Sequence, residues 1–89
     1  MEYEIIHLPQ ENRFVAEVDG KTACVEYTIH EGYLNIAHTY VPPAIGGRGV
    51  ASALVEAAYT YARQAGFSPQ ATCSYAVLWL GKHPEFLGS

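Results

Sequence analysis

The first half of the chain alternates apolar and polar residues with the two-residue period of half-buried strands. Turn residues divide it into four such stretches: Glu2–Leu8, Arg13–Val18, Lys21–His30 and Tyr33–Val41. In the last stretch, alternation places four residues on one expected face: Leu34, Ile36, His38 and Tyr40. Asp19-Gly20 is a strong signal for a two-residue hairpin turn, and Glu31-Gly32 turns the chain again. The pattern therefore predicts an antiparallel meander of four strands.

The second half changes to the period of an amphipathic helix. From Val50 onward the apolar positions that define one helical face are Val50, Leu54, Ala57, Ala58, Tyr61 and Ala65. Gly66 suits the left-handed conformation that ends many helices. Ser68–Ser74 reads as a fifth strand, and Tyr75–Lys82 as a short second helix that stops before Pro84. A strand–helix–strand crossover requires parallel pairing of the fourth and fifth strands, so we expect an α+β fold with a mixed sheet.

A glycine-rich loop, Gly46-Gly47-Arg48-Gly49, precedes the long helix. The first N–H groups of a helix have no intrahelical partner, and no Ser, Thr, Asp or Asn stands at positions 45–49 to cap them. Glycines leave these amides open to a phosphate or pyrophosphate, to which Arg48 could add a charged contact. The alternative is a flexible turn before an ordinary core helix. Neither the P-loop nor the dinucleotide-binding fingerprint is satisfied, since no Lys-Ser or Lys-Thr pair follows and no acidic residue lies in 67–74.

Composition limits the remaining possibilities. With 89 residues, 49% of them hydrophobic and 16% charged, residues 1–89 are expected to form a single packed domain. The net charge of -4 gives no general attraction to nucleic acid or to an anionic membrane. No signal peptide or membrane span is visible, and the two cysteines read as thiols of a reducing compartment. We therefore expect a cytoplasmic protein, a monomer or weak dimer.

The loop and its surroundings resemble the Gcn5-related N-acetyltransferases. Arg/Gln-x-x-Gly-x-Gly/Ala is the pyrophosphate-binding signature of that family, and the chain matches it at Gly49 and Ala51 but departs at Gly46. The chain is more specifically similar to the family's very small members. The motifs that carry this likeness are His38-Thr39-Tyr40-Val41-Pro42-Pro43, Gly47 to Ala51, Cys73 and His83-Pro84-Glu85-Phe86.

The resemblance implies an acetyltransferase-like fold in which the fourth and fifth strands splay apart and leave a groove for the pantetheine arm. It implies acetyl-CoA or CoA as the cofactor and an unidentified amine, small molecule or protein, as the acceptor. The residues it implies for cofactor binding are Val41, Ile45, Gly46, Gly47, Arg48, Gly49, Val50 and Ala51.

Two residues are candidates for catalysis. Cys73, at the end of the fifth strand, is either a thiol beside the acetyl thioester or a buried structural cysteine. His38 is either a base for the amine or a sheet histidine with a local hydrogen bond. Many relatives have an acidic residue at the position of Tyr40, and larger ones use a tyrosine near the positions of Trp79 and Leu80. No pair of histidines has metal-ligand spacing with a cysteine, so no zinc site is expected.

These observations support two functions from different classes. The first is an acetyl-CoA-dependent N-acetyltransferase that transfers an acetyl group to an unidentified amine. The second is a CoA-binding or protein-interaction module with little or no catalytic activity, which the departures at Gly46 and Tyr40 favour. A third possibility is that the fold serves a partner and binds no cofactor.

Overall fold

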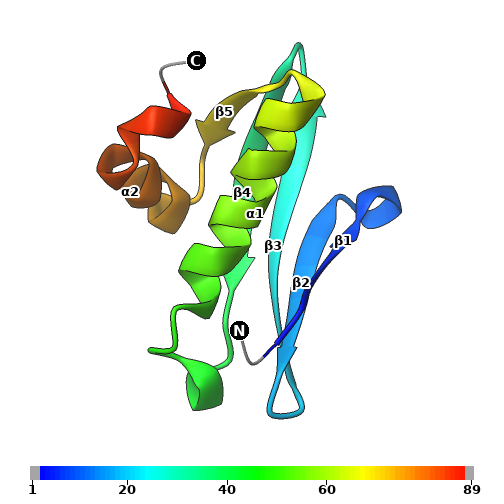
Figure 1. Cartoon of the computed structure of the whole chain (residues 1–89), viewed down its shortest axis with the longest axis vertical. Coiled ribbons are helices and arrows are strands. Elements are labelled where there is room, and N and C mark those ends of the chain that lie inside the picture. The colour runs from blue at the N-terminus through cyan, green and yellow to red at the C-terminus, as the bar shows by residue number, and fades with distance from the viewer. Residues whose placement is uncertain (1–2, 88–89) are drawn as a thin grey trace.

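A mixed sheet forms the frame of the computed structural model, which describes residues 3–87 (Figure 1). Its strands are β1 (Ile5–Leu8), β2 (Arg13–Val18), β3 (Lys21–His30), β4 (Tyr33–Tyr40) and β5 (Ser68–Ala71). They lie in the order β1-β2-β3-β4-β5, antiparallel except for the parallel pair β4 and β5. The predicted α+β fold, with a meander and one parallel pair, is confirmed.

The strand ends differ from the expected ones at three places. The predicted start of the first strand, Glu2, lies outside the described residues, and Tyr3 and Glu4 precede β1. The fourth strand ends at Tyr40 rather than Val41. The fifth ends at Ala71 rather than Ser74, because Cys73 already occupies the cap position of the next helix.

Two-residue turns join β2 to β3 and β3 to β4. Asp19 and Gly20 have φ of 52° and 75°, and Glu31 and Gly32 have φ of 52° and 85°. Positive φ at both turn residues matches the right-handed twist of the strands, which is why such turns close hairpins tightly. The expected turns are confirmed.

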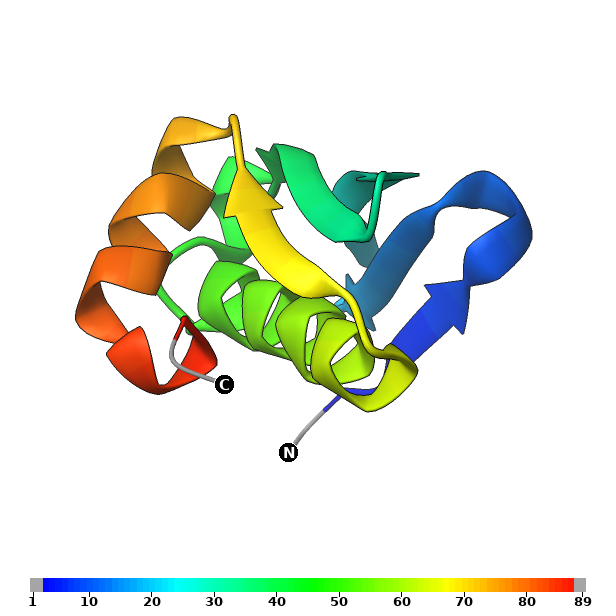
Figure 2. The ribbon, with the colours of Figure 1, turned by 90° about the horizontal axis from the view of Figure 1, so that it is seen from above.

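The long helix α1 (Val50–Ala65) covers one face of the sheet, as Figure 2 shows. Its buried residues are Val50, Leu54, Val55, Ala58, Tyr59 and Ala62. The predicted stripe was therefore wrong in part, since Ala57 and Tyr61 are only half-buried and Ala65 is exposed. The buried stripe includes Tyr59 because α1 packs against a second helix as well as against the sheet.

The second helix, α2 (Ser74–Lys82), is held against α1 by Trp79. The Trp79 side chain is 4% exposed, and its Nε1–H donates a hydrogen bond to Ser52 Oγ at 2.9 Å. Its ring stacks on His83 at 3.8 Å, and the ring of Phe86 lies 5.2 Å away. The hydrogen bond and the ring contacts of Trp79 together hold α2 in place against α1. The residue that stands near the catalytic tyrosine of larger relatives is thus part of the core.

The fourth strand contains a β-bulge that the alternation pattern did not predict. Tyr27 pairs with Ile36 but the neighbouring Glu26 pairs with His38, so Ala37 is the extra residue. One extra residue reverses the faces of all the residues that follow it. Thr39 therefore lies opposite the buried Val25, and His38 and Tyr40 lie on the other face. The expectation that His38 and Tyr40 share a face with Leu34 and Ile36 was wrong.

Candidate functional site

The glycine loop leaves the N-terminus of α1 open. Gly49 caps the helix at φ 77° without any side-chain cap among the described residues, and Gly47 has φ 80°. A Cβ at either glycine would meet no atom within 4 Å, so both positions face free space. The first intrahelical bond runs from Ala53 N–H to Gly49 O. The three preceding N–H groups, at positions 50–52, have no partner within the helix and carry its positive dipole end.

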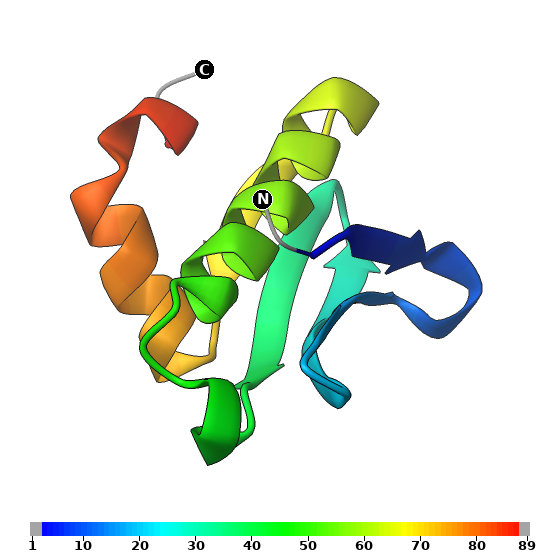
Figure 3. The same cartoon turned by 60° about the horizontal axis from the view of Figure 1, so that its bottom comes forward.

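The residues proposed for cofactor binding fall into three groups by exposure. Gly46 through Gly49 are exposed, and Figure 3 shows their loop between the end of β4 and the start of α1. Ile45 and Val50 are 1% and 2% exposed, so their side chains belong to the core and only their backbone is available to a ligand. Val41 and Ala51 are half-buried.

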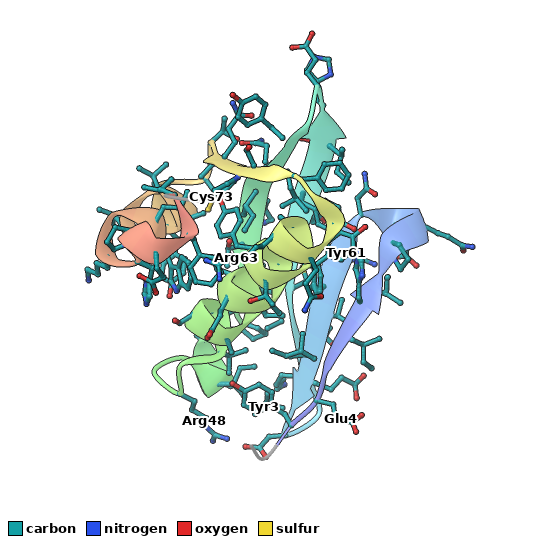
Figure 4. All side chains as sticks on the ribbon, turned by 45° about the horizontal axis from the view of Figure 1, so that its top comes forward. Tyr3, Glu4, Arg48, Tyr61, Arg63 and Cys73 are labelled. Carbon is teal, nitrogen blue, oxygen red and sulfur yellow. The ribbon has the colours of Figure 1, made fainter. Side chains whose placement is uncertain are left out.

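Arg48 has a partner that the sequence did not reveal. Its Nη1 lies 2.6 Å from Asp19 Oδ2 at the tip of the β2–β3 turn, and both side chains are substantially exposed. In Figure 4 Arg48 points away from α1. The predicted contact of Arg48 with a phosphate would thus compete with an existing ion pair, which is worth about 1 kcal/mol or less at such an exposed position.

The parallel strands β4 and β5 pair over only part of the length of β4. Their pairing ends at Ile36 and Ala71, and the backbone N–H groups of Thr72 and Cys73 both donate to Ile36 O at 3.1 Å. β4 continues to Tyr40, so within the described residues its edge after Ile36 has no strand partner on that side. The pairing of the two strands thus ends next to the bulge, and the groove implied by the resemblance stays a prediction.

Cys73 lies where the two strands part. It is half-buried at the N-cap position of α2, and its thiol donates to Thr39 Oγ1 at 3.5 Å. Partial burial opposes ionisation of this thiol. The Thr39 side chain and the amides of Ala76 and Tyr75 at the start of α2 outweigh that effect, and the pKa of Cys73 falls below its ordinary value. These amides lower the pKa through electrostatic attraction to the thiolate, because the Cys73 side chain makes no capping hydrogen bond to the helix.

His38 is not brought together with Cys73. The bulge turns the exposed His38 side chain to the face opposite Thr39, where its cross-strand partner is Glu26. The structure therefore separates the two catalytic candidates onto the two faces of β4. The contact between Thr39 and Cys73 was not expected from the sequence, although both residues belong to the motifs of the resemblance. A correct prediction would have required knowledge of the bulge.

Two hollows lie elsewhere in the part of the chain that the structure describes. One of about 400 Å³ lies at the C-terminal end of α1 and includes Arg63 and Phe86. Another, of about 520 Å³, lies between β1 and α1 and includes His7 and Tyr61. Neither includes a residue of the glycine loop.

No cluster of metal-ligating side chains occurs within residues 3–87. Within the same residues, no helix is both long enough and apolar enough to cross a membrane.

The candidate site thus consists of an uncapped helix behind a glycine loop and, next to the bulge, the end of the parallel pairing of β4 with β5. A family model described as GCN5-related N-acetyl-transferase matches residues 13–88. The chain therefore belongs to the GCN5-related N-acetyltransferase family. It is similar to the solution structure of a GCN5-like protein from Staphylococcus aureus, with 31% identity, a TM-score of 0.75, and coverage of 96% of this chain and 84% of that one. No curated protein shows significant similarity to the chain.

Proposed function

We propose that the protein is an acetyl-CoA-dependent N-acetyltransferase that transfers an acetyl group to an amine. Membership of the family supports acetyl transfer in general, and family members generally use acetyl-CoA. The observation that carries the proposal is the open N-terminus of α1, whose glycines leave the amides uncovered next to the free edge of β4.

The binding site would have two parts. The amides of the glycine loop and of the first turn of α1 would hold the pyrophosphate, because they combine free donors with the positive end of the helix dipole. The edge of β4 after Ile36 would pair with the amide groups of the pantetheine arm in place of a neighbouring strand. Free adenine nucleotides lack that arm and should bind much more weakly.

Bound acetyl-CoA would supply an acetyl thioester, and the acceptor amine would displace the CoA thiolate from it. His38, on the exposed face of β4, would accept the proton that the amine loses. A backbone N–H of the free β4 edge would stabilise the developing oxyanion. Cys73, on the other side of the strand, would offer a partly activated thiol to the same thioester.

A CoA-binding module without catalysis is the second candidate. It is favoured by two departures from the family pattern, Gly46 in place of Arg or Gln and Tyr40 in place of an acid. Thermal unfolding with acetyl-CoA, CoA and adenosine 3′,5′-bisphosphate tests the binding that both candidates share, because a ligand specific for the folded state raises the midpoint. Release of the CoA thiol from acetyl-CoA in the presence of a mixture of amines would show that the protein is an acetyltransferase. Binding without such release would favour the CoA-binding module. No shift at millimolar acetyl-CoA would remove both candidates.

Gly46→Arg should strengthen CoA binding about tenfold. Gly46 has φ −65° and ψ 156°, a conformation open to any residue, and its Cβ would meet only Pro43 O, at 3.4 Å. The substitution restores the side chain usual in the family and adds a charged donor near the pyrophosphate. Gly46→Glu is the matched control, with the same backbone and the opposite charge. Calorimetry should show tighter binding for the first and weaker binding for the second; equal effects of the two would contradict this site.

Asp19→Asn should also raise CoA affinity, by about three-fold, because it releases Arg48 from an ion pair worth about 1 kcal/mol or less. Asparagine tolerates the positive φ of Asp19, so the turn should persist. In the double variant with Arg48→Ala the gain should vanish. If Asp19→Asn improves binding equally in that background, the effect is one of net charge and Arg48 has no phosphate contact.

A further inference from the structure

One face of the sheet is covered by α1, and the other carries no helix within residues 3–87 (Figure 2). On this open face a row of residues crosses the first four strands. The register pairs Ile6 with Val15, Val15 with Cys24, and Cys24 with Tyr40. We call these four residues the open-face row. Three strand spacings of about 4.8 Å give it a length of about 14 Å.

The open-face row is more apolar and more exposed than a solvated sheet face requires. Ile6 and Tyr40 are each 49% exposed, while Val15 and Cys24 are half-buried. Directly opposite side chains on neighbouring strands are close enough to touch, so the row forms a continuous apolar strip. A strip of this kind commonly marks a surface that a partner covers.

Carboxylates flank the strip. Glu17 follows Val15 by two residues on β2, and Glu26 follows Cys24 by two residues on the antiparallel strand β3. At the β1 end, a hollow of about 310 Å³ is lined by Glu4, Ile6, Val15, Glu17 and Thr22. The arginine of this face, Arg13, is paired with Glu11 and also lies opposite Glu26 in the register, so Glu4 and Glu17 are the carboxylates that have no cross-strand cation. The charge presented to a partner is therefore negative.

The row also ends at the candidate site. Tyr40 lies on the part of β4 that has left β5, and His38, two residues earlier, faces the same side. A molecule lying along the strip would reach His38 at one end. The base proposed for the amine and the apolar strip thus form one continuous surface.

We propose that the open face docks the acceptor, and that the acceptor is a lysine-containing basic peptide in extended form. This inference rests on the proposed acetyl transfer to an amine. Apolar side chains of the peptide would cover the open-face row, its cationic side chains would meet Glu4 and Glu17, and one lysine would reach His38. A free polyamine matches the carboxylates, but its methylene chain is too thin to cover the exposed side chains of Ile6 and Tyr40.

The test measures binding of a fluorescent peptide, capped Gly-Lys-Gly-Leu-Gly-Lys-Gly, by anisotropy at low salt, because its lysine and leucine side chains share one face when the peptide is extended. Glu17→Lys should weaken binding about five-fold, because an exposed attraction becomes a repulsion. Glu56→Lys is the control, since it makes the same charge change on exposed α1, on the covered side of the sheet. Ile6→Ser should weaken the same peptide without any change of charge.

Equal losses for Glu17→Lys and Glu56→Lys, or no loss for Glu17→Lys, would overturn the proposal. So would tighter binding of spermidine than of the peptide, which would make a free polyamine the better ligand. Thermal shifts with acetyl-CoA are measured on the same variants and should match those of the parent protein. If the proposed function is wrong, acetyl-CoA produces no thermal shift. If only the docking surface is wrong, that thermal shift remains, and Glu17→Lys weakens peptide binding no more than Glu56→Lys does.

Discussion

Trp79→Ala is expected to lower the free energy of unfolding by about 3–5 kcal/mol. The indole is 4% exposed and contacts His83 and Phe86 through its ring. Its Nε1–H also joins α2 to Ser52 of α1. The truncation therefore removes both the packing and the hydrogen bond that hold α2. A domain of this size has a total stability of roughly 4–13 kcal/mol, so the variant should be close to unfolding.

Urea denaturation followed by circular dichroism measures the loss. Trp79→Phe keeps an aromatic ring but removes the donor, and it should cost less than the alanine variant. Leu78→Ala, one residue earlier on the same helix, is the control, because Leu78 is 66% exposed and should change stability by about 0.5 kcal/mol or less. Similar losses for Trp79→Ala and Leu78→Ala would show that α2 is not anchored through Trp79.

Cys73 is expected to be the reactive thiol of the protein. Its lowered pKa means that the thiolate forms at lower pH than in a small thiol such as N-acetylcysteine. The rate of alkylation should therefore rise with pH and level off at lower pH than it does for that reference thiol. Incubation with acetyl-CoA should release CoA and leave an acetyl group on this residue, which mass spectrometry would locate. Cys73→Ala should abolish the modification.

The same lowered pKa has a consequence for stability. A group whose pKa is lower in the folded state ionises more readily there, so Cys73 stabilises the fold increasingly as pH rises through its folded pKa. Below that pKa the contribution is lost. Thr39→Val should raise the pKa by removing the hydroxyl that favours the thiolate, and the alkylation profile should move to higher pH. If Cys73 resists alkylation and its alanine variant loses stability instead, the residue is a packing element.

Local signals were sufficient to predict most of the fold. The turn pairs at Asp19 and Glu31 require positive φ in a two-residue loop, and this requirement fixed the ends of β2, β3 and the start of β4. The change from a two-residue to a 3.6-residue period fixed the start of α1 at Val50. The glycines before it predicted a helix without a side-chain cap, because no residue at positions 45–49 could supply one.

The features that were missed depend on long-range contacts. The bulge at Ala37 is set by the pairing of β3 with β4, and nothing in the sequence of either strand marks the extra residue. The buried face of α1 was misplaced because Tyr59 packs between β5, where its hydroxyl donates to Gln70 O, and Trp79 of α2, and the helical period alone cannot show this. The ion pair of Arg48 joins residues 29 positions apart. Each error altered the description of the site, most of all for His38.

The proposed acetyl-CoA site consists of the glycine loop and the free edge of β4. Titration of ¹⁵N-labelled protein with acetyl-CoA can locate the bound cofactor, because each backbone amide gives a separate signal. We expect the largest chemical-shift changes at the amides of positions 47–52 and of positions 37–40, and smaller ones at Cys73. Shifts concentrated around Arg63 and Phe86, at the opposite end of α1, or no saturable shifts at all, would contradict the proposed site.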